Sequence, residues 1–242
     1  GGEPRHDRVS VPGPPILLTQ GETASITVVN RTSEPTTVHW HGMELESVYD
    51  GVAGWGRTGS RVAPLVAPGD SFVVEMTPPR AGTFIYHSHM DETDQLRSGM
   101  YGPLIVLEPG ERFEPSVDRV FTIGQTVDAW IAINGQDQPA PQNLRAGTRY
   151  RLRFINIHRD ATVDISLRGD SGPLRWHAEA KDGAYLLPAL RGERNARVRM
   201  GVGETYDFTW TPARPGEATL LVHAPFPTEP GEAWLRQTWR VR

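Results

Sequence analysis

Glycine and proline are spread along the whole chain, and the apolar segments between them are short. The 242 residues include 25 glycines and 21 prolines. No stretch of a dozen residues keeps its apolar side chains at the 3.6-residue spacing of a helix. Since glycine and proline interrupt regular elements, their even distribution favours many brief strands joined by turns. We therefore expect an all-β protein in which helices are few and short.

Alternating polar and apolar residues mark the individual strands. Four segments show β-branched or aromatic residues on one face, namely 24–30, 71–76, 149–155 and 205–210. The apolar run Leu104–Leu107 and the final segment 235–242 are also typical of strands. Short strands of this kind, separated by turn residues, predict β-sandwich architecture.

A charged segment rich in proline and glycine, 108–115, follows the run that ends at Leu107 and is typical of a boundary between domains. The two flanking halves share a pattern. Thr19–Thr23 leads into a strand that ends at Asn30, and Leu144–Thr148 leads into one that ends at Asn156. We predict two related sandwich domains in tandem, 1–112 and 113–242, rather than one large barrel.

Charge and hydropathy exclude several classes of partner. The chain carries 25 basic and 29 acidic residues, a net charge of −4, without the basic stripe of a nucleic-acid-binding protein. No apolar run approaches the ~18 residues that cross a membrane. We expect neither a nucleic acid nor a membrane as partner. The chain has no cysteine, which excludes disulfides and thiolate metal ligands within it.

Four of the eight histidines form two closely spaced pairs, His39-Trp-His41 and His87-Ser-His89. On a strand, residues i and i+2 project from the same face, so each pair offers two imidazoles side by side. Imidazole suits copper, zinc, iron or nickel, whereas the sequence lacks the thiolates of iron–sulfur sites and a dense cage of carboxylates for calcium. We predict a metal site here and ordinary structural or solvent-exposed roles for the other four histidines, His6, His158, His177 and His223.

The order of motifs around these pairs resembles the laccase-like multicopper oxidases. The first half resembles their first cupredoxin domain in segments 37–42, 50–52, 67–72, 82–89 and 99–106. The second half resembles their second domain, less specifically, in segments 133–135, 150–156, 182–183 and 202–208. The resemblance implies two tandem cupredoxin-like Greek-key β-sandwich domains, the second without copper ligands.

The resemblance also implies a role for each residue of the two pairs. His39 would bind the type 2 copper, whereas His41 and His87 would bind one ion of the type 3 copper pair and His89 the other. Asp50 would be the carboxylate that helps to supply protons for the reduction of O2 to water. The alternative for Asp50 is a plain turn residue before Gly51.

The chain departs from the family pattern at the type 1 copper. That site needs a cysteine and two histidines, within motifs of the forms His-x-x-His-x-His and His-Cys-His, and neither motif occurs here. We expect a portion of a multicopper oxidase that supplies half of the trinuclear site, with the type 1 domain on the same polypeptide or another subunit. The absence of an initiating methionine before Gly1 agrees with a segment of a longer protein.

Two alternatives stay open at this stage. One is a stand-alone module that holds a single copper or zinc ion through His41, His87 and His89, since three imidazoles and an open position form a known catalytic zinc site. The other is a structural protein on the cupredoxin scaffold. Family resemblance implies a periplasmic or extracellular location. The resemblance also implies that the reducing substrate is selected beside the type 1 copper, which this chain lacks.

The absence of a thiolate predicts the optical behaviour of the chain. After copper loading, the isolated chain should show no blue thiolate-to-copper absorption and no oxidation of phenols or metal ions above that of free copper. Absorption spectroscopy and oxygen uptake measure the two properties. Clear turnover by the isolated chain would contradict the expectation that electrons must come from a site outside it.

Overall fold

The structure is a computed structural model and describes residues 10–56, 61–91, 93–225 and 232–242. The all-β class is confirmed, because the helical elements of the described residues are one α-helical turn and one 3-10 turn, α1 (Asp94–Arg97) and η1 (Ser47–Tyr49). The segments expected at 24–30, 71–76, 149–155 and 205–210 are strands β2 (Ala24–Val29), β4 (Ser71–Met76), β10 (Tyr150–Asn156) and β17 (Thr205–Trp210). No helix in these ranges has the length and apolar character needed to cross a membrane.

The first half of the chain forms two sheets around a small apolar core. A four-stranded sheet has the order β1 (Ile16–Thr19), β6 (Tyr101–Leu107), β5 (Gly82–Ser88) and β3 (Val38–His41), and β2 pairs with β4 in a second sheet. The core between them includes Trp40, Val74, Met76, Phe84 and Leu104. Every residue of β6 is buried, which agrees with its nearly continuous apolar sequence.

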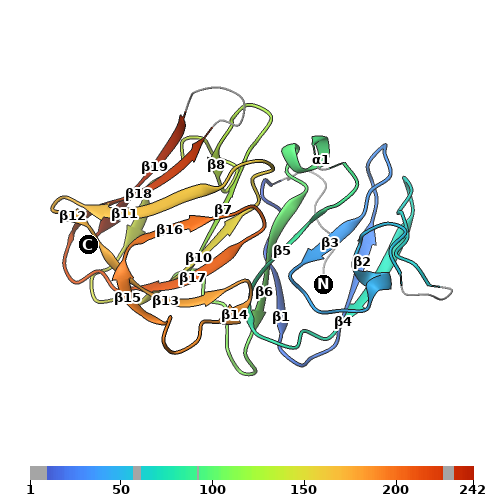
Figure 1. Cartoon of the computed structure of the whole chain (residues 1–242), viewed down its shortest axis with the longest axis horizontal. Helices are drawn as coiled ribbons and strands as arrows, with labels where there is room; N and C mark the ends of the chain where they lie inside the picture. Colours follow the sequence, from blue (N-terminus) through green and yellow to red (C-terminus); the bar gives the residue numbers. More distant parts are fainter. Residues whose placement is uncertain (1–9, 57–60, 92, 226–231) are drawn as a thin grey trace.

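The second half forms a larger sandwich, seen to the left of the first in Figure 1. One sheet has the order β14 (Ala184–Tyr185), β13 (Arg175–Lys181), β17, β10, β7 (Asp118–Gly124) and β8 (Ala132–Ile133), with β15 (Gly192–Asn195) beside β13. The other has the order β12 (Gly172–Pro173), β11 (Val163–Gly169), β18 (Gly216–Pro225), β19 (Glu232–Val241) and β9 (Gln142–Leu144), with β16 (Arg197–Met200) beside β11. Aromatic side chains fill the core, among them Phe121, Phe154, Trp176, Phe208 and Trp239.

Among the described residues, no sheet combines strands from both halves. The proline- and glycine-rich segment 108–115 lies between the end of β6 and the start of β7. The division into domains 1–112 and 113–242 is compatible with this separation and stays a prediction.

The pattern shared by the two halves has a structural counterpart. After β2, the backbone of Asn30 exchanges two hydrogen bonds with the turn before β4, accepting from Gly69 and donating to Asp70. At the end of β10, Asn156 does the same with the turn before β17, accepting from Gly203 and donating to Glu204. Both asparagine side chains are buried and donate to backbone carbonyls of the same turn regions. The two halves thus repeat one turn at equivalent places.

A buried group of charges joins the two halves at β5. The hydroxyl of Thr83 donates to Oδ1 of Asp207 at 2.7 Å, and Arg153 donates to the Thr83 hydroxyl at 3.0 Å and to Oδ2 of Asp207 at 3.1 Å. Arg151 donates to the same Oδ2, and Asp118 accepts two further bonds from Arg153. The side chains of Arg153 and Asp207 are each 1% exposed, so these bonds are shielded from water. The strand that carries His87 is therefore anchored to the second half.

A turn of the second half also contacts this strand. Asp182 and Gly183 connect β13 to β14, and Arg80, two residues before β5, donates to both of their carbonyl oxygens at 3.2 and 3.3 Å. An apolar cluster completes the junction, with Ile85 and Tyr101 from the first half and Ile155 and Ile157 from the second. The segment 182–183, one of those that carry the family resemblance, thus serves the contact between the halves.

Replacing the central carboxylate should weaken the whole protein. The substitution Asp207→Asn removes the negative charge that the buried Arg153 shares with the partly buried Arg151, and we expect a loss of unfolding free energy on the order of 3 kcal/mol. Urea denaturation measures it. The matched control is Glu217→Gln, which breaks an ion pair with Arg240 whose side chains are both more than half exposed, and should change stability by about 0.5 kcal/mol or less. Equal losses in the two variants would contradict the role of this junction.

Candidate metal centre

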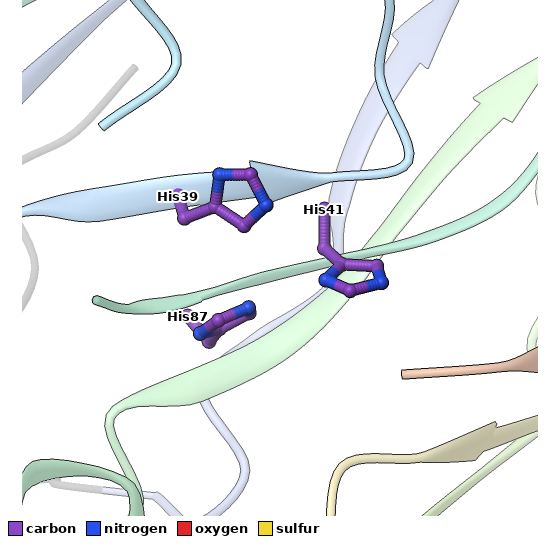
Figure 2. A group of neighbouring side chains, drawn as sticks. All are labelled: His39, His41 and His87. Carbon is purple, nitrogen blue, oxygen red and sulfur yellow. The ribbon is translucent and has the colours of Figure 1, made fainter. Parts of the chain in front are cut away.

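The two predicted histidine pairs meet because β3 and β5 are neighbours. His39 and His41 lie on β3, and the antiparallel register pairs His39 directly with His87 of β5. One ring nitrogen from each of these three histidines lies within 4.8 Å of those of the other two. Figure 2 shows the three imidazoles gathered beside the two strands. The ring centroids of His39 and His87 are 5.2 Å apart, and that of His41 is 5.5 Å from His39.

The residue between the first two ligand candidates points the other way. Trp40 is 1% exposed and belongs to the apolar core that also contains Phe84. This alternation follows from the two-residue period of a strand and puts the histidine rings on the opposite face. Trp40 is thus a core residue.

His89 follows β5 and lies close to the same group. Its ring centroid is 5.4 Å from that of His39 and 6.2 Å from that of His87. All four histidines predicted as ligands therefore come together. The tightest set combines His39 with His41 and His87, and the division of the four between copper ions stays a prediction.

Hydrogen bonds orient two of the rings. Nδ1 of His39 lies 2.8 Å from the carbonyl oxygen of Asp50, and Nδ1 of His87 lies 2.7 Å from that of Ser88. Because a carbonyl oxygen only accepts, each Nδ1 carries the proton and each Nε2 keeps its lone pair. A fixed tautomer of this kind is what a metal-binding histidine requires.

Burial also keeps the rings of His87 and His41 uncharged. Burial, together with the neighbouring histidines, lowers the pKa of His87 to about 4. Burial, together with His39, also lowers the pKa of His41. Both rings are neutral at neutral pH, which is the form that binds a metal ion.

Asp50 is a turn residue whose side chain also lies beside His39. It caps the 3-10 turn η1, and its backbone carbonyl accepts from His39. Its carboxylate lies 3.5 Å from Nδ1 of the same ring and is 32% exposed. The geometry is compatible with a proton carrier, and that function stays a prediction.

A polar network beside the cluster could not be found from the sequence. Oε1 of Gln95, in α1, accepts from the hydroxyls of Thr36 and Ser88, and its amide nitrogen donates to the carbonyl of Pro35. Ser88 stands between His87 and His89, so the network fixes the end of β5 where the second pair lies. No motif or periodicity marks a glutamine in a four-residue helical turn, and only the fold brings it to Ser88.

The remaining histidines do not join the cluster. His158 is completely buried, and its Nε2 donates to the carbonyl of Trp130 at 2.8 Å. His177 and His223 lie on β13 and β18 beside carboxylates of the second half. His6 lies outside the described residues. These placements agree with the structural roles predicted for His158, His177 and His223.

Residues 9–111 match the family described as multicopper oxidase. The chain belongs to the multicopper oxidase family. It is 38% identical over 284 aligned positions to a copper resistance protein A homolog of Pseudomonas syringae pv. tomato, an alignment that covers 88% of this chain and 45% of the relative. It is 33% identical to the multicopper oxidase MmcO of Mycobacterium tuberculosis, covering 84% of this chain and 47% of that protein.

Solved structures support the same relationship over nearly the whole chain. The crystal structure of the blue copper oxidase from Nitrosomonas europaea is similar with a TM-score of 0.76 and 25% identity, covering 96% of this chain and 77% of that one. The cupredoxin-like fold therefore extends through both halves. The chain spans about half the length of the curated relatives described above.

The network around Gln95 predicts a coupled loss of stability and metal binding. The substitution Gln95→Met removes three hydrogen bonds and leaves two buried hydroxyls without their acceptor, which should cost about 1–3 kcal/mol. Metal affinity should also fall, because Ser88 separates two ligand candidates. Thermal unfolding and metal titration measure the two effects. Gln20→Met, which removes one exposed bond to the carbonyl of Pro79, is the control and should change neither; a Gln95 variant that behaves like it would exclude a supporting role.

Proposed function

We propose that this chain supplies half of the trinuclear copper site of a multicopper oxidase, which reduces O2 to water. The observation that carries the proposal is the convergence of His39, His41 and His87 within 4.8 Å on adjacent strands. His89 lies beside them. Family membership supports copper as the metal.

The donor set fits copper. All candidate ligands are imidazoles, two of them held in the tautomer that leaves Nε2 available. Imidazole binds copper well, whereas a site for calcium or magnesium would present oxygen ligands. His39 would hold the type 2 copper, His41 and His87 one ion of the type 3 pair, and His89 the other. Bound copper would supply one-electron redox chemistry toward O2.

The residues of this chain would position the imidazoles and supply protons to the site. The β3–β5 pairing sets His39 opposite His87 and thereby brings the candidate ligands together. The Asp50 carboxylate, beside His39 and partly open to solvent, would hold a proton next to the cluster and pass it inward. Such a supply is needed because the reduction of O2 to water consumes protons.

A complete site needs partners outside these residues. The sequence contains no cysteine for a type 1 copper, and its paired histidines form one side of a cluster. The electron-donating type 1 domain would belong to the same polypeptide or to another subunit, with O2 as the second partner. A periplasmic or extracellular location agrees with this function. The chain alone would be inactive as an oxidase.

The tight group of three imidazoles also favours a second candidate, a module that holds one copper or zinc ion. The structure groups His39 with His41 and His87, whereas the sequence-based alternative used His41, His87 and His89. Three imidazoles and an open position suit catalytic zinc. Competition between copper and zinc for the purified chain, with metal stoichiometry, distinguishes this candidate from a multinuclear half-site.

Metal analysis tests the proposal directly. After loading with Cu²⁺ and dialysis, the chain should retain copper, and His87→Ala should lose most of it because the most deeply buried imidazole of the tight group of three is gone. The matched control is His177→Ala, a half-exposed histidine of the second half, which should retain the copper of the unmodified chain. Copper content that is zero, or equal in all three proteins, would overturn the metal site.

A further inference from the structure

The turn between β16 and β17, in the second half, lies directly against His41. A Cβ atom at Gly203 would be 2.7 Å from Nε2 and 2.8 Å from Cε1 of the His41 ring. Figure 2 shows one ring nitrogen of His41 on the side of His39 and His87 and the other on the opposite side. Nε2, beside Gly203, is the outer one, which leaves Nδ1 facing the cluster. The ring thus lies between its fellow ligands and the backbone of Gly203.

Hydrogen bonds hold the turn that contains Gly203 in place beside the His41 ring. Its backbone is bonded on both sides to Asn156, with Gly203 donating to the Asn156 carbonyl at 2.8 Å and Glu204 accepting at 3.0 Å. The Asn156 side chain is completely buried and donates to the carbonyls of Met200 and Gly201. Glu204 is further held by Lys181 at 2.5 Å. Any added atom at position 203 would therefore displace the imidazole, which is the mobile end of a side chain.

The first half contains the same turn without this contact. Gly69 donates to Asn30 as Gly203 donates to Asn156, and the two glycines have φ angles of 84° and 79°. A Cβ at Gly69 would meet no atom within 4 Å. An alanine costs backbone strain at either position, since both lie in the left-handed region. Only at position 203 would it also meet a candidate ligand.

We propose that Gly203 is a positioning residue for His41: by lacking a side chain, it sets how deeply the ring lies in the cluster and thereby tunes the metal affinity. The inference rests on the proposed metal site. It gives the second half of the chain, which holds none of the four candidate ligands, a direct part in shaping that site.

The pair Gly203→Ala and Gly69→Ala tests the proposal in the otherwise unchanged chain. Both variants should lose a similar, small amount of thermal stability. Cu²⁺ affinity, measured by titration, should fall about 10-fold or more in Gly203→Ala and stay within about twofold in Gly69→Ala, as expected for residues that orient a ligand. In the metal-free protein, NMR resonances of the His41 ring should shift in Gly203→Ala alone, and the copper-loaded variant should show an altered EPR spectrum.

Two outcomes overturn the inference: unchanged His41 resonances and copper affinity in Gly203→Ala, or equal losses of affinity in both alanine variants. If the unmodified chain binds no copper, the proposed function fails, while the ring resonances still test the positioning. Should Gly203→Ala not fold, the variants are repeated on His41→Ala, where the removed ring makes room. There Gly203→Ala and Gly69→Ala should be equally stable, and a chain that still fails to fold only with Gly203→Ala would refute the contact with His41 as the cause.

Discussion

The pairing of β3 with β5 is the constraint on which the site depends. Its register sets His39 opposite His87 and sends Trp40 into the core. Because strand side chains alternate, a shift by one residue would bury the imidazoles and expose the indole. The burial of Trp40, which stands between His39 and His41 in the sequence, thus stabilises the strand register that brings the candidate ligands together.

Contacts with the second half of the molecule stabilise this pairing. β5 has β3 and β6 on its two sides, and its Thr83 is bonded to the buried carboxylate of Asp207. Ile85 packs in the apolar cluster that includes Ile155. These anchors fix the position of the strand whose other end carries His87. The second half acts as a support whose turn at Gly203 reaches the ligand cluster.

Much of the fold and of the candidate site could be predicted because the relevant signals are local. The two-residue period that identified 24–30 and 71–76 is a property of neighbouring residues, and the same period put both histidines of each pair on one face. Gln95, Thr83 and Asp207 gave no such signal. Each acts on residues far away in the sequence, and an isolated polar side chain has the same appearance whether it is buried or solvated.

The sequence by itself determined the all-β class, the turn-rich strands, the absence of a thiolate and the four imidazoles available to a metal, since composition and short-range periodicity carry this information. The tertiary structure decided which strands are neighbours, that Asp50 and Ser88 orient the rings, and that Gly203 lies against His41. These contacts depend on how two sandwiches pack. That packing is set by the sum of many burial and hydrogen-bond energies over the whole chain, and no short motif encodes it.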